Sequence, residues 1–390
     1  MDRLVPRMRP HRTSVFGAMS ARATELGAVN LGQGFPDVDG PASVQDAAIT
    51  AIREGRGNQY PPVHGVPELR RSIAAHQKRF YGLEVDPVDG VVVGTGASET
   101  LVAAILALVD EGDEVIVVEP YFDLYAAAID LARGTRITIP MTMDSGRFSV
   151  DLDALDARIT SRTRLIVINS PHNPTGSMLS GHELDRIAAI AREHDLIVLS
   201  DEAYEHLVFD GVHHRPIATL PGMWERTITV GSAGKSFSLT GWKVGWASGP
   251  PDLIAAVRTV RQHLSYVSSG PFQWAIVEAL ALPDSYFVEM ATDLQRRRDR
   301  LAAGLSGCGL APSSTFGTYF FATDVRPLGF ATGADFCEDA LTRAGVAAIP
   351  VQAFCDSHIG DPYVRWTFCK RDAVLDEAIG RLLKSFGSRG

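Results

Sequence analysis

The sequence is poor in cysteine, has no long apolar run and carries no excess of positive charge. Its four cysteines lie between Cys308 and Cys369 without a C-x-x-C pair, so we expect free thiols and no metal site. No stretch approaches the roughly 18 apolar residues of a membrane span, and no apolar signal region follows the basic start. A formal net charge of −9 argues against nucleic acid or a membrane surface as the main partner. We expect a cytoplasmic protein that acts on small molecules.

Lysine is also scarce, because the 37 basic residues include only five lysines. Arginine is therefore the usual cation of this chain, and a lysine among small residues suggests a need for its amine. Lys235 lies in the segment SAGKS, with Lys243 eight residues on. An amine can lose its proton and condense with a carbonyl, whereas a guanidinium stays charged. We interpret Lys235 as a Schiff-base nucleophile, although this segment alone fits a surface lysine equally well.

The length predicts two domains, since 390 residues exceed the roughly 250 to 300 at which one core stops growing. Short β-branched runs alternate with helical patterns from Val91 to Gly249, which is typical of an α/β fold. Most runs are apolar throughout, as in a largely parallel sheet covered on both faces. The predicted strands are 91–93, 114–118, 136–139, 164–168, 196–199, 227–230 and 244–247, with helices at 98–109 and 181–194.

A smaller α+β unit is predicted after Pro283. A charged helix over 284–305 leads into it, strands at 317–322 and 363–368 flank a helix at 334–343, and an amphipathic helix ends the chain. We divide the chain into an N-terminal segment (1–44) that contributes to the small domain and to the wall of the active site, a large domain (45–283), and a linking helix with the small domain (284–390).

Polar segments follow several predicted strands, at the edge where α/β sheets bind ligands. The amides of Ala97 and Ser98 open a helix and could bind a phosphate. Phe122 could lie against a flat heterocycle or belong to the core. Two prolines and a glycine fix the turn that presents Asn173. Asp201, three residues before Tyr204, could keep a pyridine nitrogen protonated or could cap a helix.

Together these segments resemble the class I/II aminotransferases of fold type I, which use pyridoxal 5′-phosphate. The resemblance covers nearly the whole chain and is greatest to kynurenine aminotransferase, glutamine transaminase K and actinobacterial N-succinyldiaminopimelate aminotransferases. It implies a large domain with a mostly parallel seven-stranded sheet between helices, and a smaller α+β domain. The motifs are VNLGQGFPD (29–37), NQYPPVHGVPELR (58–70), SPHNPTG (170–176), SDEAYEHLVFD (200–210), TGWKVGW (240–246) and YVRWTFCK (363–370).

The resemblance implies a role for each cofactor-binding residue. Lys235 matches the lysine that holds the cofactor and moves the substrate proton, and Asp201 matches the partner of the ring nitrogen. Asn173 and Tyr204 match the groups that bind the phenolic oxygen, and Phe122 matches the stacking ring. The residues that match the phosphate site are Ala97, Ser98, Ser232, Lys243 and, from a neighbouring subunit, Tyr60, which implies a homodimer. Lys243 replaces an arginine of many relatives but still offers a positive charge.

The substrate residues follow from the same resemblance. Arg365 matches the arginine that binds the α-carboxylate through two parallel hydrogen bonds, helped by the Gly34 backbone. Phe16 matches an aromatic wall of the kynurenine enzymes, while Ser98 stands where those enzymes can carry tyrosine. The implied reaction is ping-pong transamination of kynurenine, glutamine, methionine, an aromatic amino acid, or N-succinyldiaminopimelate with glutamate and 2-oxoglutarate. The alternatives are a cysteine-conjugate β-lyase on the same site and a non-catalytic ligand sensor.

Overall fold

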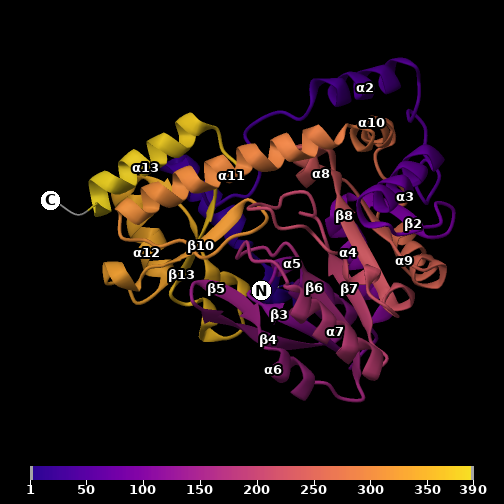
Figure 1. Cartoon of the computed structure of the whole chain (residues 1–390), viewed down its shortest axis with the longest axis horizontal. Coiled ribbons are helices and arrows are strands. Elements are labelled where there is room, and N and C mark those ends of the chain that lie inside the picture. The colour runs from indigo at the N-terminus through magenta and orange to yellow at the C-terminus, as the bar shows by residue number, and fades with distance from the viewer. Residues whose placement is uncertain (1–2, 388–390) are drawn as a thin grey trace.

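An eight-stranded sheet runs through the larger part of the molecule in the computed structural model, which describes residues 3–387 (Figure 1). Residues 1–2 of the predicted N-terminal segment and residues 388–390 of the predicted small domain lie outside the described residues. The strand order is β2-β9-β8-β7-β6-β3-β4-β5. The strands are β2 (Val91–Thr95), β3 (Glu114–Glu119), β4 (Thr135–Asp144), β5 (Arg147–Val150), β6 (Thr163–Asn169), β7 (Ile197–Asp201), β8 (Thr227–Ser232) and β9 (Val244–Ser248).

The sheet is mostly parallel at its centre, as predicted, and has one strand more than the seven expected. Strands β4, β3, β6, β7 and β8 pair in parallel, whereas β9 runs antiparallel to both of its neighbours. The additional strand is β5, which forms an antiparallel hairpin with the extended β4 at the sheet edge. Its four residues alternate between half-buried and buried, which is too short a pattern to stand out in the sequence.

Helices cover both faces of this sheet because its strands are apolar on both sides. In β6, Leu165 and Val167 pack into one core with α4, α5 and α9, while Ile166 and Ile168 pack into another with α7. A third core joins β2 and β9 to α2, α3 and α10. The helices of this part are α2 (Ala42–Arg53), α3 (Pro67–Tyr81), α4 (Gly96–Leu108), α5 (Asp123–Ala132), α6 (Leu152–Ala157), α7 (Gly181–Glu193), α8 (Ala233–Ser236), α9 (Pro251–Leu264) and α10 (Gly270–Leu280).

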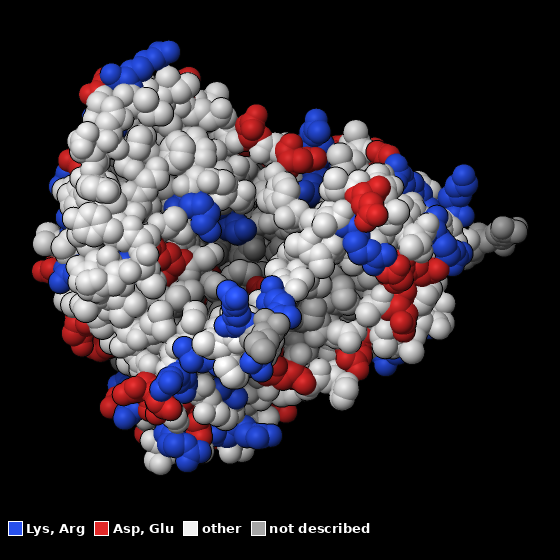
Figure 2. Space-filling view, turned by 180° about the vertical axis from the view of Figure 1, so that it is seen from behind, with Lys and Arg blue, Asp and Glu red and all other residues white. Residues whose placement is uncertain are grey.

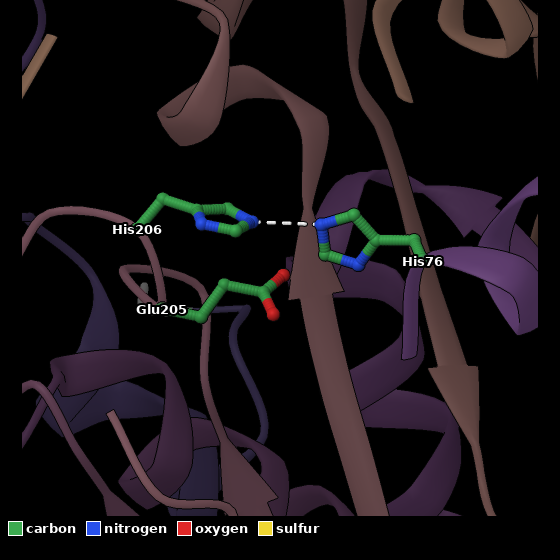
Figure 3. A group of neighbouring side chains, drawn as sticks. All are labelled: His76, Glu205 and His206. Atoms are coloured by element: carbon green, nitrogen blue, oxygen red, sulfur yellow. Dashed lines mark hydrogen bonds between the residues drawn. The ribbon is translucent and has the colours of Figure 1, made fainter. Parts of the chain in front are cut away.

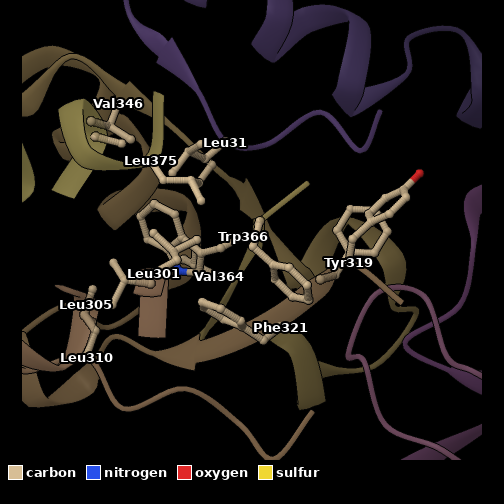
Figure 4. Packing of buried hydrophobic residues seen from close by; sticks show 14 of the residues in the cluster. Leu31, Leu301, Leu305, Leu310, Tyr319, Phe321, Val346, Val364, Trp366 and Leu375 are labelled. Carbon is tan, nitrogen blue, oxygen red and sulfur yellow. The ribbon is translucent and has the colours of Figure 1, made fainter. Parts of the chain in front are cut away.

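The smaller part combines the C-terminal third of the chain with N-terminal residues. Strand β13 lies between β10 and β12 in an antiparallel sheet, and β1 pairs with β11. Leu31, Leu301, Trp366 and Leu375 meet in its core (Figure 4). The elements are α1 (Val15–Glu25), β1 (Val29–Asn30), α11 (Asp284–Gly307), β10 (Phe320–Asp324), α12 (Gly333–Asp339), β11 (Val346–Ala347), β12 (Ile349–Pro350), β13 (Tyr363–Thr367) and α13 (Asp372–Phe386).

Two details of this part differ from the sequence expectations. Strand β10 begins at Phe320, three residues later than predicted, because Gly317 forms only an isolated bridge to Val208. The predicted helix at 334–343 is α12 followed by a π-helical turn (Ala340–Ala344). The remaining short helices are 3₁₀ turns at Pro6–His11, Ile217–Thr219, Trp224–Arg226, Thr240–Trp242, Arg326–Leu328, Val351–Phe354 and His358–Gly360.

The fold places the candidate residues at one edge of the large sheet. Strands β3, β6, β7 and β8 run parallel, so the segments that follow them, with Phe122, Asn173, Tyr204 and Lys235, emerge at the same edge. Seen from behind, the surface is hollowed between the two parts, with Lys and Arg beside the hollow (Figure 2). The four cysteines are free thiols. None of the helices within residues 3–387 has the length and apolar character that crossing a membrane requires.

Candidate active site

A cavity of about 260 Å³ brings together all but one of the predicted site residues. It lies between the edge of the large sheet and strand β13 of the smaller part. Its lining includes Phe16, Gly34, Ala97, Ser98, Phe122, Asn173, Asp201, Tyr204, Ser232, Lys235, Lys243 and Arg365. Tyr60 is the exception: its side chain is 79% exposed, packs edge-on against Tyr266 and does not line the cavity of its own chain.

One end of the cavity is suited to an anion. Ala97 and Ser98 lie in the first turn of α4, where unpaired amides and the positive end of the helix dipole favour negative charge. A Cβ on Gly96 would lie 3.2 Å from the Lys243 ammonium, so this cation stands over the start of the helix. A Cβ on Gly245 would come within 2.3 Å of the Ala97 amide, so only glycine lets β9 approach so closely.

A buried carboxylate lies deeper in the cavity. Oδ2 of Asp201 accepts a hydrogen bond from the Tyr125 hydroxyl at 2.6 Å, and Oδ1 accepts one from the Ala203 amide at 3.1 Å. Burial raises the pKa of Asp201, and these two hydrogen bonds oppose that shift. Asn169 ties the neighbouring strand ends together by donating to the Asp201 carbonyl and accepting from the Asn173 amide. The carboxylate is therefore fixed in position before any ligand binds.

The Lys235 amine lies in a short turn, α8, directly after β8. Its Nζ donates to the Tyr319 hydroxyl at 2.9 Å, and that hydroxyl donates to the Gly34 carbonyl at 2.7 Å. The Tyr204 ring lies 5.6 Å from the same nitrogen. Burial lowers the pKa of Lys235 to about 8, because the ammonium loses its hydration. More of this amine than of an ordinary lysine is therefore unprotonated near neutral pH and able to act as a nucleophile or base.

Arg365 provides a buried cation at the opposite side of the cavity. Its Nη atoms donate to the Asn173 amide oxygen at 3.0 Å and to the Gly32 carbonyl at 2.6 Å, while its Nε has no hydrogen-bond partner among residues 3–387. The rings of Phe320 and Phe16 lie 4.0 and 4.8 Å from the guanidinium carbon. No carboxylate among residues 3–387 lies at ion-pair distance from Arg365, and Asp123 acts on it only from farther away, so a bound anion would supply the close counter-charge.

Three side chains of this site had no role in the sequence interpretation. Tyr125 holds Asp201, Tyr319 holds Lys235, and Phe320 stacks against Arg365. Tyr125 lies three residues after Phe122, within the first turn of α5, and helical spacing could have suggested it. Tyr319 and Phe320 come from a segment far from the other motifs along the chain, so no local pattern connects them with Lys235.

These groups fit pyridoxal phosphate. The anion site at the start of α4 suits the phosphate of the cofactor, and the Lys235 amine suits its aldehyde carbon. The buried Asp201 carboxylate suits the protonated ring nitrogen, and Tyr204 and the Asn173 amide suit the phenolic oxygen. The amide oxygen of Asn173 is occupied by Arg365, which leaves its NH₂ group to donate into the cavity. Fold and site together define an enzyme that uses this cofactor, which serves as an electron sink for the substrate Cα carbanion.

Comparison with known proteins gives the family. The profile for aminotransferase class I and II matches residues 27–382, and the chain belongs to this family. It is a pyridoxal phosphate-dependent transaminase that acts on amino acids and 2-oxo acids.

Three relatives illustrate the similarity. The probable N-succinyldiaminopimelate aminotransferase DapC of Mycobacterium tuberculosis is 50% identical over 97% of both chains. The solved structure of the N-succinyldiaminopimelate aminotransferase of that organism has a TM-score of 0.95 at 51% identity, covering 97% of this chain and 99% of the other. Kynurenine–oxoglutarate transaminase of Dictyostelium discoideum is 40% identical, covering 95% of this chain and 94% of its own.

Proposed function

We propose that this transaminase interconverts N-succinyldiaminopimelate and its 2-oxo acid. Glutamate and 2-oxoglutarate are the second pair of amino acid and 2-oxo acid. The 50% identity to the mycobacterial N-succinyldiaminopimelate enzyme, over 97% of both chains, is the observation that carries this proposal. The kynurenine relative is also similar over almost its full length, but at 40% identity. Kynurenine, glutamine, methionine and aromatic amino acids are therefore the competing substrates for the experiment.

We assign the residue roles from the geometry of the cavity. Arg365 binds the substrate α-carboxylate, because it is a buried cation without an internal carboxylate partner. Lys235 attaches the cofactor and transfers the Cα proton, because its partly buried amine lines the cavity and has a lowered pKa. Asp201 binds the ring nitrogen, and Phe122 covers the ring. Ala97, Ser98, Ser232 and Lys243 bind the phosphate, while Gly34 and Phe16 border the substrate.

We also propose a homodimer in which Tyr60 binds the cofactor phosphate of the neighbouring subunit. An exposed tyrosine beside the exposed Tyr266 has no function in the cavity of its own chain. Tyr60→Phe should weaken cofactor binding a few-fold, which is the scale of one hydrogen bond of about 1 kcal/mol. Fluorescence titration of cofactor-free protein would measure the affinity for the cofactor, and an unchanged affinity would contradict the role of Tyr60.

The cytoplasmic location of the protein also stays a prediction.

The substrate proposal is tested by half-reactions. Cofactor-loaded enzyme is mixed separately with N-succinyldiaminopimelate, kynurenine, glutamine, methionine and glutamate, and conversion of the cofactor to its amine form is followed by absorbance. We expect the largest second-order rate constant with N-succinyldiaminopimelate, and we expect glutamate to react rapidly as well. Faster conversion by kynurenine or glutamine would overturn the substrate. Pyruvate release from a cysteine conjugate without conversion would indicate a lyase.

The role of Lys235 is tested by Lys235→Ala. Loss of the group that moves the proton should lower kcat by more than about 10⁴-fold, while the phosphate and ring contacts still bind the cofactor. Lys370→Ala is the matched control, because Lys370 is a buried lysine that contacts the Phe35 carbonyl instead of lining the cavity. A Lys235→Ala enzyme that turned over near the wild-type rate would remove Lys235 from the mechanism.

A further inference from the structure

A second group of buried polar side chains lies on the segment that carries Asp201 and Tyr204. Glu205 and His206 continue this segment, and His76 approaches them from α3. Their exposed fractions are 3% for His76, 3% for Glu205 and 7% for His206. One nitrogen or oxygen from each residue lies within 4.8 Å of the other two. Figure 3 shows the imidazole nitrogens facing each other and the Glu205 carboxylate beside the gap between them.

The hydrogen bonds of this group are incomplete. The Nε2 atoms of His76 and His206 lie 2.7 Å apart, so the rings share one hydrogen and one ring offers its lone pair. Nδ1 of His76 and Oε2 of Glu205 are buried without a hydrogen-bond partner among residues 3–387. An unpaired buried polar atom costs roughly 1–3 kcal/mol. Two such atoms in one cluster suggest that a bound group completes it.

Aromatic rings enclose the three side chains. The Phe80 ring lies 4.7 Å from each imidazole, and the Phe287 ring lies 4.1 Å from that of His206. Rings packed at these distances separate the cluster from bulk solvent. Burial disfavours the charged form of a histidine, and neutral imidazoles are the form that binds a metal.

We propose that His76, Glu205 and His206 form a binding site for one divalent transition-metal ion, with zinc as the ion that fits best. Two imidazole nitrogens and one carboxylate oxygen are ligands that zinc accepts. Coordination uses the lone pair of each Nε2, so the shared hydrogen moves to Nδ1 and the carboxyl group of Glu205 gives up any proton it carries. The Tyr81 hydroxyl hydrogen bonds to Glu205 and would orient it.

The position of the site indicates a structural role. An ion bound there would link α3 to the segment after β7, which also supplies Tyr204 to the active-site cavity and directly follows Asp201, the last residue of β7. Residues 76 and 205 are distant along the chain, so the link closes a long loop and would stabilise the folded state. This inference does not depend on the identity of the substrate.

The first test uses tag-free, cofactor-loaded enzyme that has been dialysed against a chelator and then against metal-free buffer. Zn²⁺ is added during calorimetry, and Co²⁺ is added while its visible absorption is recorded. We expect one ion per chain, a higher Tm with Zn²⁺, and the intense Co²⁺ bands of low coordination number. X-ray absorption of the zinc protein should show imidazole nitrogens at about 2.0–2.1 Å. Absence of a stoichiometric ion, or a bound ion without imidazole neighbours, would overturn the proposal.

Variants locate the ion. His76→Gln and His206→Gln should each weaken Zn²⁺ binding by at least about 100-fold, because a ligand is lost from a set of three. His182→Gln is the control, since His182 is exposed on α7. Cofactor absorbance and circular dichroism report whether each variant folds. Unchanged binding in both folded variants would refute the site, and if neither folds the wild-type X-ray absorption spectrum decides.

Discussion

Two arginines are almost fully buried among residues 3–387, and they differ in what surrounds them. Arg261 on α9 and Arg365 on β13 are each 1% exposed. Arg261 donates from Nε to the Glu99 carboxylate at 3.3 Å and from Nη1 to the carbonyls of Val63 and Tyr266. Arg365 donates to one side-chain amide oxygen and one backbone carbonyl and lies against aromatic rings, but it donates to no carboxylate. One guanidinium has a carboxylate at ion-pair distance, and the other has only the more distant charge of Asp123.

The energetic cost of burying each guanidinium separates an arginine with a structural role from one with a proposed binding role. Removing a charge from water costs several kcal/mol unless a partner compensates it. Burial lowers the pKa of both guanidinium groups. The Glu99 ion pair opposes this shift at Arg261, whereas at Arg365, whose pKa falls to about 10, no carboxylate lies at ion-pair distance and the charge of Asp123 acts only from farther away. Arg365 is still protonated near neutral pH. A substrate carboxylate would therefore gain a cation already stripped of water and held in place, which is the preorganisation that a binding site needs.

Of the two buried arginines, Arg365 should show the larger effect on activity when it is removed. Arg365→Met should lower kcat/KM by about 10³-fold, since two charge-assisted hydrogen bonds to the substrate are worth roughly 4 kcal/mol together. Unfolding in denaturant should show a free energy that is unchanged or higher, because an uncompensated buried charge is gone. Steady-state kinetics and denaturation of one preparation test both parts. A large loss of stability with little loss of activity would reverse the assignment.

The paired arginine should give the opposite result. Arg261→Met should lower the free energy of unfolding by about 3 kcal/mol, because Glu99 stays buried without its counter-charge. The effect on kcat/KM of folded protein should be much smaller than in Arg365→Met. A double variant that also carries Glu99→Gln should recover part of the stability, since both charges are then absent. Absence of any recovery would show that Arg261 does not act through Glu99.

The sequence was informative for Arg365 and uninformative for Arg261. Arg365 lies within YVRWTFCK, a motif that the family resemblance identified, and the strand there was predicted almost to its ends. Arg261 looks like any other arginine of an amphipathic helix, because its partner Glu99 lies 162 residues away. Side chains that meet only through tertiary packing leave no local pattern. His76, Glu205 and His206 were missed for this reason, and so was Tyr319.

The fold was predictable where periodicity is strong. The apolar strands at the centre of the large sheet and the long helix α11 were recognised, whereas the short edge strand β5 was not. The division into parts at residues 44 and 283 stays a prediction. Most of the predicted site residues follow parallel strands, and the topology alone brings such residues to one edge.

A carboxylate ligand provides an intermediate effect that depends on Arg365. At about 100 times its Kd, 2-oxoglutarate should stabilise the cofactor-loaded wild-type enzyme by about 2.7 kcal/mol. Arg365→Met should show little of this gain, because the cation that binds the carboxylate is missing. Arg261→Met should keep it. Thermal unfolding with and without the ligand measures the difference, and equal stabilisation of wild type and Arg365→Met would place the anion elsewhere.

The smallest effect concerns Lys235, a partly buried cation of the cavity that differs from both arginines because it can lose its proton. Burial lowers its pKa to about 8, so the amine is mostly protonated at pH 7 and mostly neutral at pH 9. Only the neutral amine attacks an aldehyde, so covalent attachment of the cofactor to cofactor-free enzyme should accelerate about 10-fold per pH unit below pH 8 and level off above it. Stopped-flow absorbance between pH 7 and 10 measures this rate. A rate that kept rising towards the ordinary lysine pKa would mean that burial does not activate the amine.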